Sequence, residues 1–154
     1  PAATPSNVHG VTSIVAGNCG FTLAPLHAED ADYLRRMMAR VEGMPLAALE
    51  LGVDWQWESF ADYLGRLDGT LGVNAGFMVG HCALRRYVLG EDFMRESTPD
   101  ELEQLKVLLR SSLQSGGLGF STTRSSTSGW ECAGCARRPG SRRWCCWATR
   151  VGDR

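Results

Sequence analysis

A thiol stands at the end of the most strand-like stretch of this sequence. Residues 10–16 are apolar and β-branched with little alternation, a pattern typical of a strand covered on both faces, and the turn Gly17-Asn18-Cys19-Gly20 follows. The carboxyl ends of parallel strands carry the chemistry of α/β folds. A thiolate there is a good ligand for Zn²⁺, although a lone cysteine is also a common small core residue. The neighbouring residues by themselves leave both interpretations open.

Two further polar residues follow apolar runs in the same way. His81 comes after the run 73–79, and Ser121 lies near the end of the run 118–122. If these runs are parallel strands, both side chains lie at the same edge as Cys19. His81 is then either a hydrogen-bonded histidine at the rim of a pocket or a ligand, and Ser121 is a hydrogen-bonding residue. The other cysteine and histidines before residue 123 are interpreted as structural or peripheral: Cys82, His9 and His27.

The elements that must position these residues alternate between strands and helices. The apolar runs predict short strands at 10–16, 73–79 and 118–122. The three- and four-residue spacings predict four helices. They are expected at 29–41, at 45–51, in a segment that ends at about residue 67, and from residue 99 to the stop at Gly116-Gly117. The last helix has the clearest local signal, because Thr98 and Glu101 form a capping box. This order implies right-handed crossovers, and therefore an α/β fold with a parallel sheet or barrel.

Core and surface positions follow from the same spacings. The helix that ends near residue 67 has an apolar stripe, which is far more typical of a core than of a ligand site: Trp57, Phe60, Ala61, Leu64 and Leu67. The pair Arg85 and Arg86 is interpreted as solvated surface, with attraction of an anionic substrate as the alternative.

The net charge of −1 hides two different segments. Residues 1–122 have a net charge of −6 and two of the six cysteines, whereas residues 123–154 have a net charge of +5 and the other four cysteines. The sequence has neither a signal peptide nor an apolar run long enough to span a membrane. We therefore expect a cytoplasmic protein with reduced thiols and no membrane partner.

The segment from residue 123 onward shows neither helical nor strand periodicity. Four interpretations compete for it: a zinc site, a basic arm that binds nucleic acid, a disordered tail, and an out-of-frame product of GC-rich coding sequence. The first is weakened because Cys145 and Cys146 are adjacent, where zinc ribbons have a two-residue gap between cysteines. We favour the last, because arginine, tryptophan and cysteine are abundant while lysine is absent from this segment.

Several motifs of residues 1–122, in order and without large gaps, resemble those of one family. They are His9-Gly10-Val11-Thr12, Gly17-Asn18-Cys19-Gly20, Arg40-Val41-Glu42-Gly43, Trp55-Gln56-Trp57, Val79-Gly80-His81 and Gly117-Leu118-Gly119-Phe120-Ser121. Together they are similar to the N-acyl-D-amino-acid deacylases, or D-aminoacylases, of the amidohydrolase superfamily. The resemblance implies a partial (β/α)8 TIM barrel of the metal-dependent amidohydrolase type, covering about its strands two to four.

The resemblance also implies a chemistry. Cys19 would be a Zn²⁺ ligand, while Asn18, His81 and Ser121 would line the substrate pocket or support the ligand. A zinc-bound hydroxide would cleave the linear C–N amide bond of a small N-acyl-D-amino acid. The family's His-x-His pair, its later histidines and its catalytic aspartate have no counterpart among these residues. We therefore expect no catalytic residue within this chain, and no activity from it in isolation.

A rival interpretation from a different class remains. Residues 1–122 could form a non-catalytic α/β domain, with residues 123–154 as a basic, cysteine-rich segment that binds zinc or nucleic acid. The deacylase interpretation predicts no nucleic-acid partner. Metal stoichiometry and salt-dependent DNA binding by residues 123–154 discriminate between the two.

Overall fold

The computed structural model of the chain describes residues 4–122. The predictions made for residues 123–154 lie outside this part of the chain. Within it, none of the helices is long and apolar enough to cross a membrane.

Short strands form two parallel ladders in this part of the chain. The strands are β1 (Ser13–Ala16), β2 (Asn74–Phe77), β3 (Val79–Gly80) and β4 (Phe120–Ser121). β1 pairs with β2, and β3 pairs with β4, both in parallel. The parallel arrangement and the mixed α/β class agree with the sequence-based prediction, whereas a partial barrel stays a prediction.

The expected strand at 73–79 is divided between the two ladders. The backbone N–H of Met78 still donates to Ala16 O at 2.9 Å, whereas that of Val79 donates to Gly119 O at 2.8 Å. The chain therefore changes partner after Met78, and the carboxyl ends of β1, β3 and β4 come together.

The first strand differs from the expectation of a strand covered on both faces. Its residues alternate between exposed and half-buried, and Val15 is 57% exposed. In the described part of the chain, β2 is the one strand that pairs with β1. Among the described residues β1 therefore has one exposed face, shown by the alternating burial, and one edge without a strand partner.

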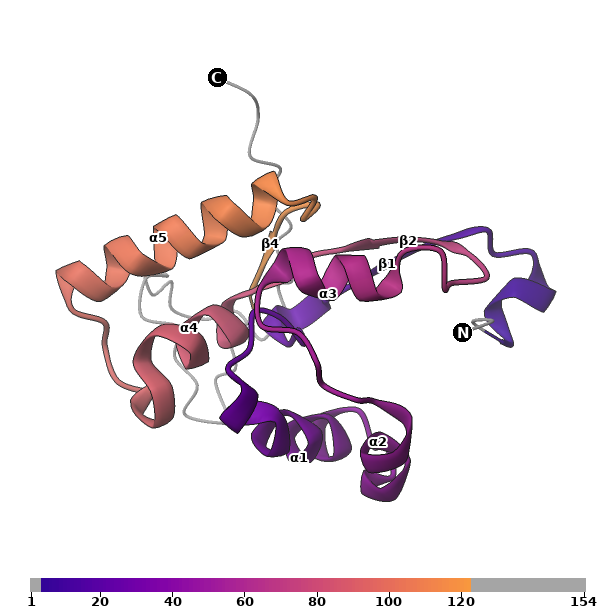
Figure 1. Cartoon of the computed structure of the whole chain (residues 1–154), viewed down its shortest axis with the longest axis horizontal. Coiled ribbons are helices and arrows are strands. Elements are labelled where there is room, and N and C mark those ends of the chain that lie inside the picture. The colour runs from indigo at the N-terminus through magenta and orange to yellow at the C-terminus, as the bar shows by residue number, and fades with distance from the viewer. Residues whose placement is uncertain (1–3, 123–154) are drawn as a thin grey trace, which may run out of the picture.

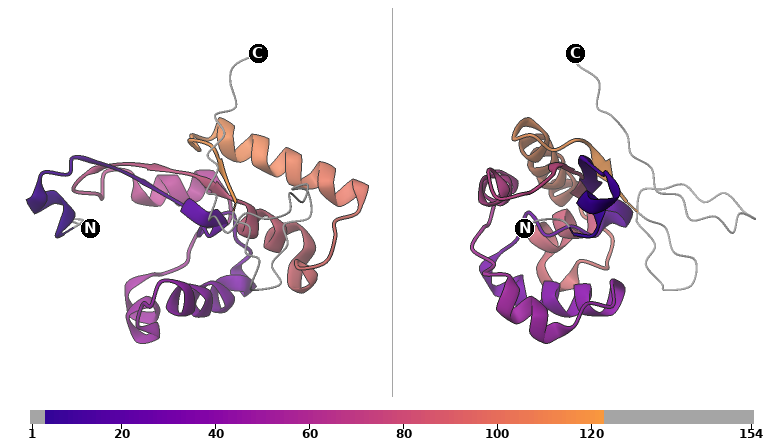
Figure 2. Two further views of the ribbon diagram at one scale, coloured as in Figure 1. Left: turned by 180° about the vertical axis from the view of Figure 1, so that it is seen from behind. Right: turned by 90° about the vertical axis from the view of Figure 1, so that its right-hand side faces the viewer.

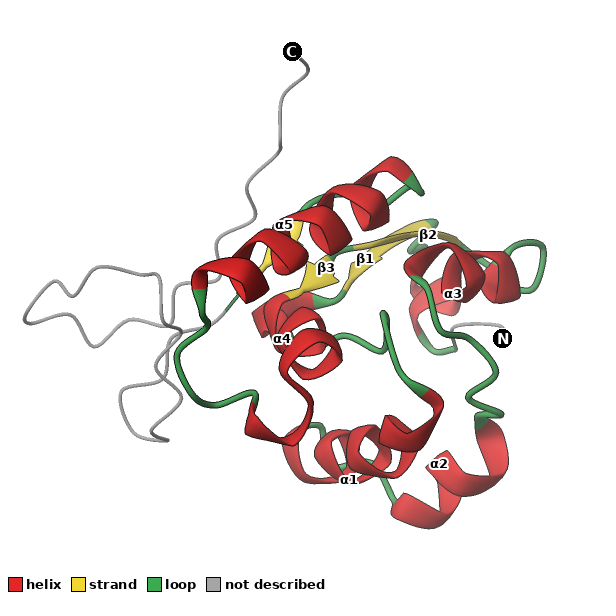
Figure 3. Ribbon diagram, turned by 60° about the vertical axis from the view of Figure 1, so that its left-hand side comes forward, coloured by secondary structure: helices red, strands yellow, loops and turns green. Residues whose placement is uncertain are grey.

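Helices surround these ladders on several sides. They are α1 (Ala31–Val41), α2 (Leu46–Gly52), α3 (Phe60–Leu67), α4 (His81–Leu89) and α5 (Pro99–Gln114), with short 3-10 turns η1 (Ser6–His9), η2 (Asn18–Gly20), η3 (Ala28–Asp30) and η4 (Gly90–Asp92). Figures 1 and 2 show α5 and the α1–α2 pair at opposite ends of the molecule, and Figure 3 shows α4 between them. The sequence-based prediction missed α4, because its first residue was assigned to the end of a strand and no side chain caps it.

Most of the buried apolar residues between positions 4 and 122 form two clusters. One joins α3, α4 and α5 to β3 and contains Phe60, Val79, Leu84 and Leu105, among others. The second joins α1 to the segments around it and contains Leu26, Leu34, Met37 and Trp55.

The predicted stripe of α3 needs one correction. The helix begins at Phe60, so its inward positions fall three, four and seven residues later, at Tyr63, Leu64 and Leu67. Ala61 lies about 100° around the helix from Phe60 and is exposed. Tyr63 instead packs inward, with its ring centroid 5.3 Å from that of Phe77.

Candidate functional site

The turn that carries Cys19 follows β1 and has an unusual backbone. Gly17 (φ 90°), Cys19 (φ 60°, ψ 14°) and Gly20 (φ 79°) all lie in the left-handed region. Glycine adopts this conformation freely, whereas for a residue with a side chain it costs about 1–2 kcal/mol. In this turn the left-handed residue with a side chain is Cys19 and not Asn18, although asparagine adopts this conformation more readily than most residues. Asn18 is exposed, and Cys19 is half-buried.

Ser121, at the end of β4, bonds both sides of this turn. Its hydroxyl donates to the carbonyl oxygen of Gly17 and accepts a 3.1 Å hydrogen bond from the backbone N–H of Gly20. Ser121 is only 4% exposed. The two ends of the Cys19 turn are therefore connected through a single buried side chain from a distant part of the sequence.

Thr22 joins the same turn to β3. Its hydroxyl accepts a 3.1 Å hydrogen bond from the N–H of Gly80 and donates to Ala24 O at 3.1 Å. The approach is so close that a Cβ on Gly80 would lie 2.5 Å from both Gly20 O and Thr22 Oγ1. A Cβ on Gly17 would lie 2.8 Å from Met78 O. Glycine at 17 and 80 is therefore required by contact between the turn and the neighbouring strand.

His81 is the first residue of α4, directly after β3. Its Nδ1 lies 3.2 Å from the hydroxyl oxygen of Thr122, and its ring packs edge-on against that of Phe120 at 5.4 Å. Burial, reinforced by the positive charge of Arg85, lowers the pKa of His81 to about 4. The imidazole is therefore neutral near pH 7, the form in which histidine binds metals or accepts a hydrogen bond.

The structure thus brings the candidate residues to one edge. The η2 turn that contains Asn18 and Cys19 contacts β3, β4 and α4. His81 is the first residue of α4, directly after β3, and Ser121 ends β4, so both lie where the sequence predicts for the carboxyl ends of parallel strands. The roles proposed for these four residues stay predictions, because a shared edge does not by itself show what binds there.

A metal needs more than this edge provides. Among residues 4–122 there is no group of three or more histidine, cysteine, aspartate or glutamate side chains that could hold a metal ion. Catalytic zinc is held by about three protein ligands. The thiol of Cys19 is a suitable ligand type, but the described residues do not complete a site around it.

Two arginines that we interpreted as solvated are instead packed into the structure. Arg85 is 7% exposed, and its guanidinium donates 2.8 Å hydrogen bonds to Phe93 O and Ser97 Oγ and a further one to Arg95 O. The solvated-surface interpretation was wrong for Arg85, because carbonyl and hydroxyl oxygens of the 89–97 segment replace water around its charge. The arginine–arginine dipeptide gives no signal of these partners.

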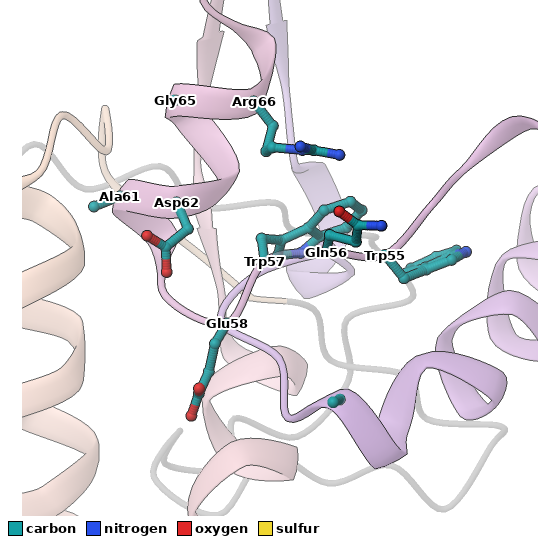
Figure 4. A pocket seen from close by; sticks show the side chains of 9 residues that line it. Trp55, Gln56, Trp57, Glu58, Ala61, Asp62, Gly65 and Arg66 are labelled. Atoms are coloured by element: carbon teal, nitrogen blue, oxygen red, sulfur yellow. The ribbon is translucent and has the colours of Figure 1, made fainter.

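An open groove elsewhere on the molecule contains none of the four candidate residues. The segment 55–58 and helix α3 form its walls, with Trp55, Trp57, Glu58 and Arg66 among the lining side chains (Figure 4). Trp57 anchors this segment to the rest of the fold, because its indole N–H donates to Leu23 O at 2.7 Å. Trp57 thus packs against the core, as its spacing predicts, and Trp55, for which no such prediction was made, is buried in the core as well.

Comparison with known proteins supports the resemblance seen in the motifs. Over 121 residues, which make up 77% of this chain and 22% of the relative, the sequence is 40% identical to a D-aminoacylase of Alcaligenes xylosoxydans xylosoxydans. It is 35% identical over 123 residues to an N-acyl-D-aspartate deacylase of the same organism, covering 79% of this chain and 22% of the relative. No protein-family model matches the chain.

Solved structures give the same result. A crystal structure of a D-aminoacylase, described as defining a novel subset of amidohydrolases, superposes with a TM-score of 0.58 at 40% identity. The match covers 77% of this chain and 23% of that one. Another D-aminoacylase structure, with the same TM-score and identity, is described as having a binuclear metal centre.

These matches place the chain among relatives of the amidohydrolases. Within that class its named relatives are D-aminoacylase and the N-acyl-D-aspartate and N-acyl-D-glutamate deacylases. The resemblance predicted from the motifs is therefore confirmed. The chain spans only about a fifth of the length of the curated relatives that it matches.

Proposed function

We propose that this chain is part of a metal-dependent hydrolase that cleaves the linear C–N amide bond of N-acyl-D-amino acids. The single observation that carries the proposal is the 40% identity to a D-aminoacylase over most of the chain. Two further relatives with a stated activity are an N-acyl-D-aspartate deacylase and an N-acyl-D-glutamate deacylase. A small N-acyl amino acid is the proposed substrate, and a cytoplasmic location stays a prediction.

We assign Cys19 to the metal site of that hydrolase. Support comes from its place at the carboxyl end of a parallel strand, from the turn that holds it in a left-handed conformation, and from the affinity of thiolates for Zn²⁺. Zinc, when bound, would supply the activation of water for attack on the amide. His81 and Asn18 are proposed to line the pocket beside Cys19.

The chain alone is proposed to be inactive. Its described residues offer no set of three ligands, so they do not hold a catalytic metal without further residues. A hydrolysis assay of the isolated chain with N-acyl-D-amino acids checks this directly. Turnover by the isolated chain would contradict the proposal.

The experiment for Cys19 uses the longest reading frame that contains this chain. Metal content and hydrolysis of N-acyl-D- and N-acyl-L-amino acids are measured for the unmodified protein, Cys19→Ala and Cys82→Ala. We expect Cys19→Ala to lose metal and D-specific activity together. Cys82, a half-buried cysteine on α4, is the matched control, and its variant keeps both. Retention of metal and activity by Cys19→Ala would overturn the assignment.

The same gene also tests the interpretation of residues 123–154. Translation of its last third in the other two frames should restore helix-patterned sequence if that segment is out of frame. The frame upstream of Pro1 should contain the His-x-His pair. Failure of both would remove support for the deacylase interpretation.

A further inference from the structure

The conformation of Cys19 needs a structural cause. A residue with a side chain in the left-handed region costs about 1–2 kcal/mol and persists where the surrounding structure holds it. Cys19 has this conformation between Asn18 and Gly20, in a turn of three residues. The turn itself supplies one bond, from the N–H of Phe21 to Asn18 O at 3.3 Å. Other contacts must therefore hold the backbone of Cys19.

The hydroxyl of Ser121 provides such a contact on both sides of Cys19. It donates to Gly17 O, two residues before the thiol, and accepts from Gly20 N–H, one residue after it. A serine hydroxyl has one proton to donate, and here Gly17 O receives it. Ser121 therefore has no proton left for a hydrogen bond to a substrate, and its burial keeps it away from solvent.

We propose that Ser121 is a positioning residue, whose hydroxyl holds the turn from 17 to 20 in the conformation that presents the Cys19 thiol at the strand edge. Any effect of Ser121 on metal binding rests on the function proposed above, whereas its role in the conformation of the turn does not. Because Ser121 is a residue of β4, 101 residues after Gly20, the turn takes this conformation only when β4 has formed.

Two readouts test this role without any metal. Amide hydrogen exchange at Gly20 reports its bond to Ser121, and the alkylation rate of Cys19, followed by mass spectrometry of its peptide, reports the presentation of the thiol. In Ser121→Ala we expect the Gly20 amide to exchange about tenfold faster, the equivalent of one lost hydrogen bond, and the half-buried Cys19 to alkylate faster. Ser121→Thr, which keeps the hydroxyl, restores both rates.

Ser112→Ala is the matched control. Ser112 is 2% exposed and its hydroxyl donates to Leu108 O at 2.8 Å within α5, so its variant loses a buried hydrogen bond away from the turn. Equal Gly20 exchange and Cys19 alkylation in Ser121→Ala and Ser112→Ala would overturn the proposal.

If Ser121→Ala does not fold, exchange in the unmodified protein decides. Slow exchange at Gly20 supports the bond to Ser121, and exchange at the rate of a free amide overturns it. The exchange rate of Gly20 tests the role of Ser121, and the metal content of Cys19→Ala tests the proposed function. Because the two measurements are independent, failure of one proposal is distinguishable from failure of the other.

Discussion

Arg86 on α4 donates a 2.7 Å hydrogen bond from Nε to Oδ1 of Asp30, which lies 56 residues earlier, just before α1. The side chains of Arg86 and Asp30 are 15% and 7% exposed. The Arg86 guanidinium also lies over the ring of Tyr33, 4.6 Å from its centroid. The pair therefore connects α4, which follows the candidate edge directly, to the start of α1.

Removal of one member of this pair leaves a charge with little water around it. Breaking a buried ion pair in this way costs about 3–5 kcal/mol, and we expect Asp30→Ala to lower the free energy of unfolding by about that amount. The control is Asp32→Ala, which removes an exposed partner of Arg36 on the same helix. An exposed pair contributes about 0.5 kcal/mol or less. Urea unfolding of both variants measures the difference, and equal losses would contradict the prediction.

Two glycine substitutions, one at the contact between β3 and the Cys19 turn and one in α3, are expected to have opposite effects on stability. In Gly80→Ala the new methyl group would lie 2.5 Å from the backbone oxygen of Gly20, which cannot move without opening the turn. We expect a loss of stability of about 3 kcal/mol, the upper end of the usual cost of overpacking. Gly65→Ala, in α3, has no atom within 4 Å of its Cβ.

The Gly65→Ala variant is therefore expected to gain about 0.5–1 kcal/mol, the ordinary difference between alanine and glycine in a helix. Thermal unfolding of the two variants gives the comparison. A tolerated Gly80→Ala would show that the turn is not packed against β3 in solution.

The capping box of α5 predicts a modest, local effect. Thr98 Oγ1 accepts from Glu101 N–H at 3.3 Å, and a carboxylate oxygen of Glu101 accepts from Thr98 N–H at 2.8 Å. Thr98→Ala is expected to lower stability by about 1 kcal/mol, and Thr98→Ser to retain most of it.

The bond to Arg95 and the Thr98 backbone bond hold the pKa of Glu101 at about 2. NMR titration of Glu101 should show that pKa rising toward its usual value in Arg95→Met.

Local signals were enough to predict part of this architecture. The α5 capping box, the helix after residue 29 and the strand before Cys19 follow from residues within one or two turns of each other. The shared edge of Cys19, His81 and Ser121 followed from one rule about parallel strands. These features needed no knowledge of distant contacts.

The remaining features depend on partners far apart in the sequence. Neither the left-handed backbone of Cys19 nor the hydroxyl of Ser121 that holds it is visible in the Gly-Asn-Cys-Gly motif. The burial of Arg85 follows from carbonyl oxygens in an irregular segment, which no periodicity describes. Helix α4 was missed because a strand leads directly into it, without a capping side chain to mark its start.

The buried imidazole of His81 predicts a pH dependence of stability. Burial and the charge of Arg85 lower its pKa from 6.5 to about 4 in the folded chain, so the unfolded chain binds the proton more tightly. This contribution to stability is complete above about pH 6.5 and is lost as the pH falls, by up to about 2 kcal/mol at about pH 5, where most carboxylates are still ionised. Urea unfolding between those pH values measures the slope. His81→Gln cannot titrate and should flatten it, whereas an unchanged slope would assign the pH dependence to other groups.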